Sequence, residues 1–199
     1  MSFVVEKIEN FSLSLDSRKV FLRIGCRKQR EDKIERVKVL IDKEKEKLTS
    51  LLEPKAVYTI LDYNETNKHH IFKNAEKVGL SLCTIGYNLE KECTELTERN
   101  EILRALILDV WGSETVEEVA NQVDRIISRK AREMNLWPSK RFSPGYGIWD
   151  IKEQKFIFNV LPSKEIGIEL TKSFIMIPQK SVSFRINFYR DRNLSTKRI

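Results

Sequence analysis

The sequence predicts an α+β fold in which a mixed, mostly antiparallel and twisted sheet carries helices packed on it. Two observations lead to this prediction. Strand-like apolar segments lie early and late in the chain, and long amphipathic segments lie between them. The two kinds of segment do not alternate strictly, as they would in a series of βαβ units, so an all-parallel sheet is not expected.

The N-terminal part of the chain predicts strands on either side of one long helix. Residues 11–26 alternate loosely between apolar and polar side chains and suit one or two strands. Residues 29–52 place apolar side chains on one stripe and lysines and glutamates on the other face, which predicts a helix that Pro54 ends. The β-branched and aromatic residues of 56–61 then predict a strand.

The middle of the chain predicts mainly helices. Residues 71–78 suit a short helix, and the apolar run 80–85, which lies between two glycines, predicts a buried strand. Apolar side chains then recur at helical spacing in residues 89–96 and again in residues 102–111.

A glycine and a capping residue suggest that the last of these helices ends and a new one begins. Gly112 breaks the apolar pattern, and Ser113 is a suitable N-cap for a helix that runs to about Met134. The carboxylates of Glu114, Glu117 and Glu118 would complement the positive end of that new helix.

The C-terminal part predicts a short helix followed by strands. Residues 151–161 suit the helix, and residues 166–170, 174–177 and 181–189 suit strands that are close enough in sequence to pair as neighbours.

Composition favours one domain that spans residues 1–199, with a basic tail from about 190 to 199 that we expect to be disordered and solubilising. Charged residues make up 33% of the chain and the net charge is +7. Lysines and glutamates alternate through residues 27–55, which is typical of a solvated helix face. No nucleic-acid recognition motif accompanies the charge, so nucleic acid is not an expected partner.

Cysteines and apolar runs favour a cytoplasmic protein. Cys26, Cys83 and Cys93 form no CxxC pair, which is typical of reduced thiols in the cytosol. His69 and His70 are the only adjacent histidines, and they lack the further ligands at suitable spacing that a metal site needs. No apolar run is long enough for a membrane span, so neither a metal nor a membrane is expected.

The segment from Arg141 to Trp149 has the composition of a ligand-binding loop. Pro144 fixes one backbone angle, while Gly145 and Gly147 permit angles that other residues avoid. A guanidinium binds a carboxylate through two parallel hydrogen bonds, and an aromatic face attracts a cation. Arg141 and Tyr146 would therefore suit a zwitterionic, cationic small molecule in an open recess beside the loop.

The same loop has a simpler interpretation, because Pro-Gly-Tyr-Gly is also typical of an ordinary turn between a helix and a strand. Ser143 has no neighbouring histidine to activate it, so we assign no catalytic residue. The sequence also has no P-loop, dinucleotide-binding or zinc-protease motif.

A wider pattern favours the ligand-binding interpretation. Arg141-x-x-x-Gly145-Tyr146 is followed by Leu170-Thr171-x-Ser173 and by Met176-Ile177-Pro178-x-x-Ser181-Val182-Ser183. This order and spacing resembles the S-adenosylmethionine-binding reactivation domain of cobalamin-dependent methionine synthase, and most closely its short, free-standing forms. The resemblance is strong over residues 137–188 and weaker back to about residue 21.

The resemblance implies a stand-alone reactivation subunit. Such a protein binds S-adenosylmethionine and docks on the cobalamin-binding module of methionine synthase or of another corrinoid protein. It supports the reductive remethylation of inactive cob(II)alamin, with one electron from flavodoxin or another donor. The two cofactors carry the chemistry, and the protein contributes mainly their positions.

The resemblance also implies roles for particular residues. Arg141 would bind the methionyl carboxylate, the backbone from Ser143 through Pro144 to Gly145 would contact polar groups of the ligand, and Tyr146 would flank its adenosyl or sulfonium end. Glu117 falls about where the family places an acidic residue for the amino group. On the residues alone, a carboxylate at a helix start is an equally good interpretation of Glu117.

The chain departs from the family pattern in three places. Asp16 is only a weak candidate for an N-terminal acidic contact, and Tyr189 does not lie at the spacing of the family's late tyrosine. Lys172 stands where a glutamate is common.

Two alternatives stay open. Because of the missing contacts, the chain could be a docking module for a corrinoid protein that no longer transfers methyl groups. Because of its net charge of +7, it could also be, with least support, a basic nucleic-acid binder.

Overall fold

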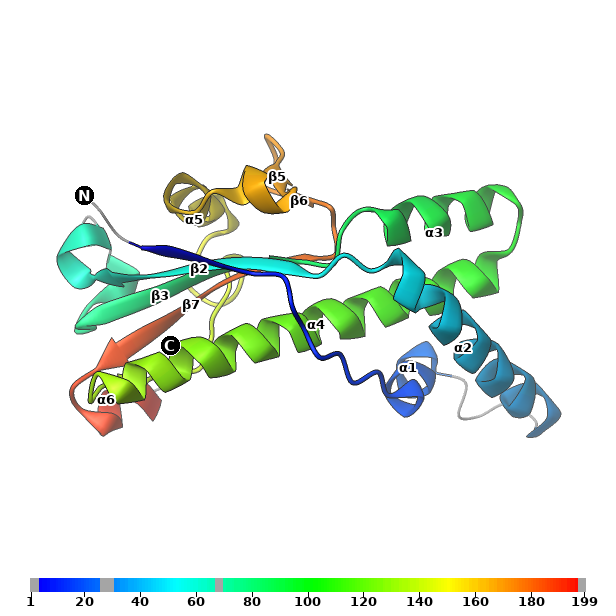
Figure 1. Cartoon of the computed structure of the whole chain (residues 1–199), viewed down its shortest axis with the longest axis horizontal. Helices are drawn as coiled ribbons and strands as arrows, with labels where there is room; N and C mark the ends of the chain where they lie inside the picture. The colour runs from blue at the N-terminus through cyan, green and yellow to red at the C-terminus, as the bar shows by residue number, and fades with distance from the viewer. Residues whose placement is uncertain (1–3, 26–30, 67–69, 197–199) are drawn as a thin grey trace.

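The protein is built around a five-stranded sheet in the order β1-β2-β3-β7-β4 (Figure 1). The computed structural model describes residues 4–25, 31–66 and 70–196. Every neighbouring pair of strands is antiparallel, which confirms the predicted mostly antiparallel sheet. The strands are β1 (Val5–Ile8), β2 (Lys55–Asp62), β3 (Lys77–Thr84), β4 (Trp137–Pro138) and β7 (Ser181–Tyr189).

Helices and loops cover both faces of the sheet. The long helix α4 (Ile102–Glu133) lies along one face, where it packs on side chains such as Phe184 and Ile186 of β7. The other face is covered by α5 (Gln154–Val160), its preceding turn η4 (Ile151–Glu153) and the turn η5 (Ser163–Ile166). Because side chains of a strand alternate in direction, the central strands contribute to two hydrophobic cores. The first core lies between the sheet and α4, and the second core lies between the sheet and α5.

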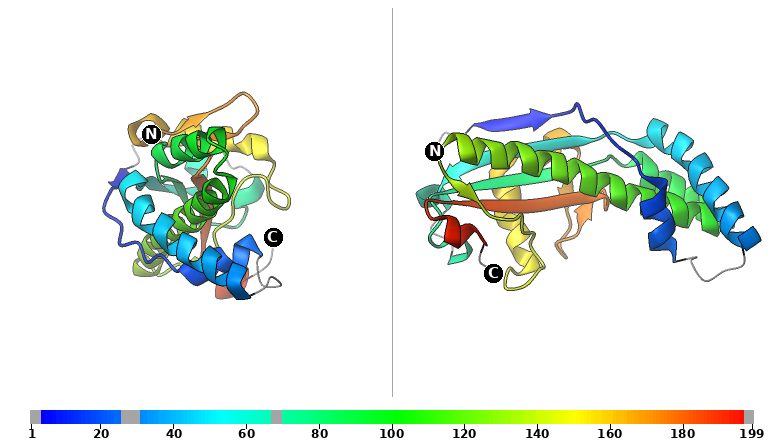
Figure 2. Two further views of the ribbon diagram at one scale, coloured as in Figure 1. Left: turned by 90° about the vertical axis from the view of Figure 1, so that its right-hand side faces the viewer. Right: turned by 90° about the horizontal axis from the view of Figure 1, so that it is seen from below.

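The remaining helices gather near the N-terminal half of α4, beyond one end of the sheet (Figure 2). They are α1 (Ser17–Ile24), α2 (Glu31–Leu51) and α3 (Asn88–Glu98). The smaller elements are the turns η2 (Tyr63–Thr66) and η3 (His70–Phe72), the hairpin of β5 (Glu169–Leu170) with β6 (Met176–Ile177), and α6 (Arg192–Thr196).

The prediction of strands in residues 11–26 was wrong, because residues 11–16 form no strand and α1 occupies Ser17–Ile24. The carboxylate of Asp16 accepts a hydrogen bond of 3.0 Å from the backbone N–H of Arg18 and caps the helix. Gly25 ends it in the left-handed conformation, at φ 79°. Val20 is the residue that α1 buries completely, and it packs in the core formed with α4. Cys26 lies outside the described residues.

The predicted helix break at Gly112 was also wrong, because α4 runs through it without interruption. A Cβ atom at this position would lie 2.2 Å from Cδ2 of Leu89, so glycine allows α3 and α4 to pack closely. Ser113 does not cap a helix. Its hydroxyl donates instead to the backbone carbonyl of Asp109, one turn earlier, at 3.1 Å.

Most other elements agree with those predicted from the sequence, and the differences are local. The helix expected at residues 71–78 is only the turn η3, and β3 already begins at Lys77. The strand expected at 166–170 is reduced to β5, which pairs with β6, whereas β7 pairs with β3 in the main sheet. Residues 192–196 of the expected disordered tail form α6. His69 and the side chain of His70 lie outside the described part.

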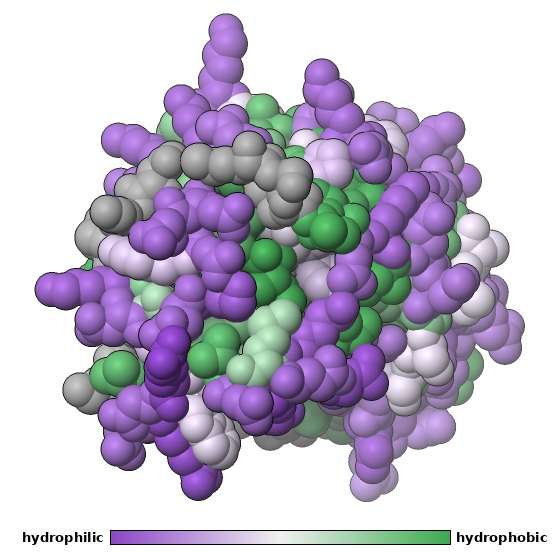
Figure 3. All heavy atoms as spheres, turned by 60° about the vertical axis from the view of Figure 1, so that its left-hand side comes forward, coloured by the Kyte–Doolittle hydropathy of each residue, from purple (hydrophilic) through white to green (hydrophobic). Residues whose placement is uncertain are grey.

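On the face in Figure 3, hydrophilic side chains predominate and hydrophobic ones gather in a strip near the centre. Within the described residues, no helix is long and apolar enough to cross a membrane.

Candidate functional site

The loop between β4 and η4 is anchored at both ends by β7 and the second core. Phe142 exchanges two backbone hydrogen bonds of 2.9 Å with Arg185 of β7, in an isolated bridge. Trp149 is buried among the side chains under α5. Its ring stacks on that of Phe142, with the centroids 6.4 Å apart.

The backbone between these anchors turns back on itself, as the glycines predicted. Gly145 has φ 91° and Gly147 has φ 52°, which side chains disfavour. The N–H of Gly145 donates to the carbonyl of Trp149 at 2.7 Å, and the N–H of Tyr146 donates to the carbonyl of Ser143 at 3.4 Å. Pro144 is buried beneath the turn, whereas Tyr146 and Ile148 are 67% and 66% exposed.

Arg141 enters the loop and pairs with Glu117 of α4. Its Nη2 donates to Oε2 of that carboxylate, and the two side chains are 22% and 47% exposed, respectively. The guanidinium carbon lies 5.7 Å from the centre of the Phe184 ring. Nη1 of Arg141 is buried and has no hydrogen-bond partner. The Nη1 group of the guanidinium can therefore donate to a further acceptor.

Among the glutamates in this part of α4, Glu117 is the one that reaches the loop. Glu118 accepts hydrogen bonds from Gln122 and Arg125 along the same helix, and Glu114 pairs with Arg23 at 3.0 Å. Because α4 is continuous from Ile102, Glu117 lies in the middle of a helix, and the helix-start explanation for this carboxylate does not apply.

A small acidic hollow lies beside Glu117, between α1 and α4. Its volume is about 40 Å³, and Arg141 and Tyr146 are not among its lining residues. Asp16 lines it from the start of α1, so the weak N-terminal candidate lies at the same hollow as Glu117. Hydrogen bonds from Arg18 hold the pKa of Asp16 below its ordinary value, so this carboxyl is charged. The hollow is lined by Ser14, Leu15, Asp16, Lys19, Trp111, Glu114, Glu117, Glu118 and Asn121.

The open recess expected between Arg141 and the Gly145–Tyr146 corner stays a prediction. Among the described residues, Glu117 lies beside the guanidinium of Arg141, and the hollow next to Glu117, of about 40 Å³, is lined by neither Arg141 nor the Gly145–Tyr146 corner. Tyr189, which does not match the spacing of the family's late tyrosine, is buried, and its hydroxyl accepts a hydrogen bond of 3.0 Å from Asn187. Lys172 is exposed in the turn before β6.

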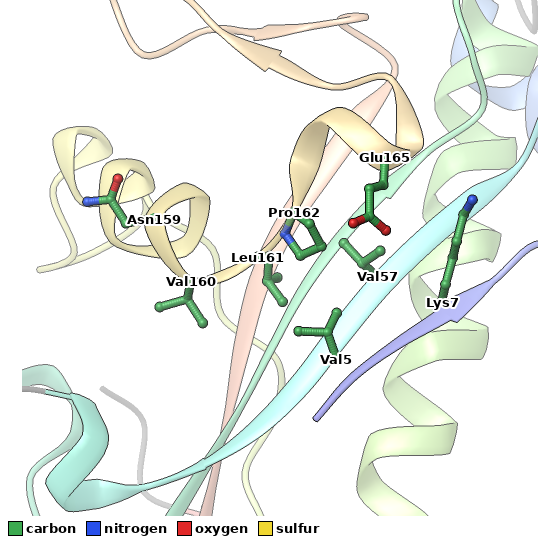
Figure 4. Close-up of a pocket in the computed structure, with 8 residues that line it drawn as sticks. All are labelled: Val5, Lys7, Val57, Asn159, Val160, Leu161, Pro162 and Glu165. Atoms are coloured by element: carbon green, nitrogen blue, oxygen red, sulfur yellow. The ribbon is translucent and has the colours of Figure 1, made fainter. Parts of the chain in front are cut away.

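A larger groove, of about 580 Å³, lies at the opposite edge of the sheet from β4 (Figure 4). Val5, Val57 and Leu161 form its apolar part, with Lys7 and Glu165 at one end. It brings none of the residues of the Arg141 loop together. Across the described ranges, no cluster of three histidine, cysteine, aspartate or glutamate side chains suits a metal ion.

Comparisons with known proteins agree with this architecture. The crystal structure of the MetH reactivation domain bound to AdoHcy superposes with a TM-score of 0.70. The alignment covers 98% of this chain and 80% of that one, at 16% sequence identity, which shows a shared fold. A comparison with curated proteins finds no match. Residues 18–190 match the family described as vitamin B12 dependent methionine synthase, activation domain, and the chain belongs to that family.

Proposed function

We propose that this protein binds S-adenosylmethionine between the Arg141 loop and α4 and presents it to a cobalamin-binding partner. The Arg141–Glu117 ion pair is the observation that carries the proposal. A methionyl group is a zwitterion, with a carboxylate that suits a guanidinium and an ammonium that suits a carboxylate. The two side chains that the ligand needs already lie in contact. Glu117 occupies the position of the ligand's carboxylate beside Arg141, and Arg141 occupies the position of the ligand's ammonium beside Glu117.

The polar atoms around the pair fit such a ligand. The buried Nη1 of Arg141 has no partner in this structure and would donate to the second oxygen of the ligand's carboxylate. Asp16 and Glu117 share the hollow in which an ammonium or sulfonium would be stabilised. Binding requires Glu117 to turn away from Arg141, and its half-exposed position on α4 permits that rotation.

The loop supplies the remaining contacts. The exposed backbone at Gly145 can approach the ligand closely, because glycine has no side chain. Its φ of 91° would strain any other residue at this position. Tyr146 presents most of its ring to solvent and would lie against the adenosyl or sulfonium end. Ser143 and Pro144 hold the turn in place through a carbonyl hydrogen bond and burial.

The partner would be the cobalamin module of methionine synthase or another corrinoid protein, with flavodoxin or another donor supplying one electron. Bound cobalamin supplies the nucleophile that accepts the methyl group. The residues of this chain bind, orient and exclude water, and such positioning can account for a large part of a barrier reduction. The free thiols of Cys83 and Cys93 are consistent with a cytoplasmic location.

Two measurements test the proposal. Calorimetry with S-adenosylmethionine should show saturable binding at one site, and absence of binding would refute it. Spectroscopy should then show methylcobalamin when the protein is mixed with an oxidised corrinoid partner, a reductant and S-adenosylmethionine.

A second candidate function is a docking module that binds the corrinoid protein without methyl transfer. The small volume of the hollow and the burial of Tyr189 favour it. It predicts a stable complex with the corrinoid protein in which no methylcobalamin forms.

A further inference from the structure

One side of β7 carries a row of polar residues into the second core. Phe184, Ile186 and Phe188 point toward α4, and the alternate positions point to the opposite face of the sheet. Those alternate residues are Ser183, Arg185, Asn187 and Tyr189, and all of them are buried. A buried face of a central strand is ordinarily apolar, so this row needs an explanation.

Most of the row forms hydrogen bonds within the protein. Ser183 donates to Gln154 of α5 at 3.2 Å. The side-chain amide of Asn187 donates to the carbonyl of Ile71 at 3.3 Å and to the hydroxyl of Tyr189 at 3.0 Å. Arg185 is the exception. Its side chain is fully buried, and Nε, Nη1 and Nη2 all lack a hydrogen-bond partner.

The Arg185 guanidinium lies among three aromatic rings, which we call the Arg185 box. Its central carbon is 5.2 Å from the centre of the Phe142 ring, 5.3 Å from that of Trp149 and 5.8 Å from that of Phe72. Aromatic faces attract a cation, and the attraction is stronger when water is excluded. The rings cannot accept the several hydrogen bonds that a guanidinium donates in its own plane.

The box contains many more donors than acceptors. The indole Nε1 of Trp149 is a further buried donor without a partner, and the only unpaired buried acceptor on this row is Oδ1 of Asn187. No carboxylate of the described chain forms an ion pair with Arg185. Burial lowers the pKa of Arg185 to about 10, so the side chain still carries its charge at neutral pH.

A buried charge without a counter-ion costs several kcal/mol, and each unsatisfied buried donor adds to that cost. Water could satisfy some of these donors but would not neutralise the charge. We propose that the Arg185 box binds a small monovalent anion, a halide or a carboxylate of the size of formate, held by the Arg185 guanidinium and the indole N–H of Trp149. A guanidinium and an indole N–H are both hydrogen-bond donors that suit either ion, and the Trp149 ring centre lies 5.3 Å from the guanidinium carbon.

The site lies directly beneath the loop that holds Arg141. Phe142 and Trp149 are the two anchors of that loop, and both are part of the Arg185 box. An anion bound there would fix the anchors to β7 and so stabilise the loop. The Arg185 box lies outside the proposed S-adenosylmethionine site, and anion binding to it can be tested without that ligand.

The direct test is a bromide soak of crystals of the unmodified protein. We expect an anomalous peak within hydrogen-bonding distance of the Arg185 guanidinium. Density for waters alone at that position, with no anomalous signal, would overturn the proposal. This experiment does not depend on any variant being able to fold.

A solution test compares anions at constant ionic strength. Replacing sodium gluconate by sodium chloride should raise the melting temperature of the protein saturably, because an anion that binds only the native state stabilises it. A parallel series with sodium formate shows which kind of anion is preferred. Arg185→Met should abolish the saturable rise. Arg190→Met removes an arginine that is 81% exposed and should retain it. Equal anion dependence in both variants would contradict the assignment.

Discussion

Arg141, in the loop after β4, donates a hydrogen bond through Nη2 to Oε2 of Glu117, in the middle of α4. The two residues are 24 positions apart in the chain, and the fold brings their opposite charges together at the edge of the acidic hollow. In the proposed site, the two charges of an amino acid would replace these two partners with little change in local electrostatics.

Removing the guanidinium should weaken binding of S-adenosylmethionine. Arg141→Ala eliminates the donor of a charged hydrogen bond, and losing such a partner costs about 2 kcal/mol, or ~30-fold in Kd. Calorimetry measures the change. Arg129→Ala is the matched control, because Arg129 pairs with Glu133 on the exposed surface of α4, and neither residue lines the hollow. Equal affinity in the Arg141 variant and the control would remove Arg141 from the site.

Substitution of Gly145 should affect both stability and ligand binding. An alanine there would adopt φ 91° with its Cβ 3.1 Å from Cδ1 of Ile151, so Gly145→Ala should destabilise the fold by about 1–2 kcal/mol. Gly167→Ala has a similar backbone angle, φ 72°, with nothing within 4 Å of its Cβ. Denaturant unfolding should show a loss in both variants, whereas calorimetry should show weaker ligand binding only in Gly145→Ala.

Because α3 and α4 pack closely at Gly112, replacing this glycine by alanine should destabilise the protein, which is the opposite of the usual effect in a helix. Alanine normally stabilises a helix relative to glycine by about 1 kcal/mol. Here its Cβ would meet the buried Leu89 at 2.2 Å, so Gly112→Ala should instead destabilise the protein by about 1–3 kcal/mol. In a Leu89→Ala background the obstacle is removed, and the same substitution should become neutral or stabilising. A double-mutant cycle by urea unfolding measures the coupling.

A carboxylate on β1 should make stability depend on acidity. Glu6 accepts hydrogen bonds from Lys130 at 2.8 Å and from Tyr58 at 2.5 Å, and these bonds lower the pKa of Glu6. Its contribution is therefore complete above the ordinary pKa of a glutamate and is lost as the pH falls through the lowered value. The melting temperature of Glu6→Gln should lie below that of the unmodified protein at neutral pH.

As the pH falls below the ordinary pKa of a glutamate, about 4.3, the two melting temperatures should approach each other, and they should coincide once the pH is below the lowered pKa of Glu6. Glu9→Gln disrupts only an exposed pair with Lys7, so its effect should be small throughout. A gap between the unmodified protein and Glu6→Gln that does not change with pH would show that the carboxylate charge contributes nothing.

The sequence predicted the elements whose patterns are long and local. The apolar stripe of α2, the buried run of β3 and the glycines of the loop all appear as expected. The pattern at residues 11–26 misled because loose alternation resembles a strand over a short window. Asp16 and Gly25 were the useful signals there, since they form the N-cap and the left-handed end of α1.

Interactions between distant segments could not be predicted in the same way. Gly112 looks like a helix breaker until Leu89 is known to pack against it. The pairing of Arg141 with Glu117 instead of with Glu118 depends on how α4 is rotated against the loop, which no local pattern fixes. Arg185 was missed altogether, because a charged residue in a strand is ordinarily interpreted as facing water.

The loop is fixed at its base, where Trp149 is buried, and exposed at its tip, where Tyr146 and Ile148 face solvent. Mutations at the tip can therefore accumulate without disturbing the hydrophobic interior. Of the two exposed tip residues, Ile148 lies outside the motif that resembles the family, so relatives with this architecture are expected to vary more at this position than at Tyr146.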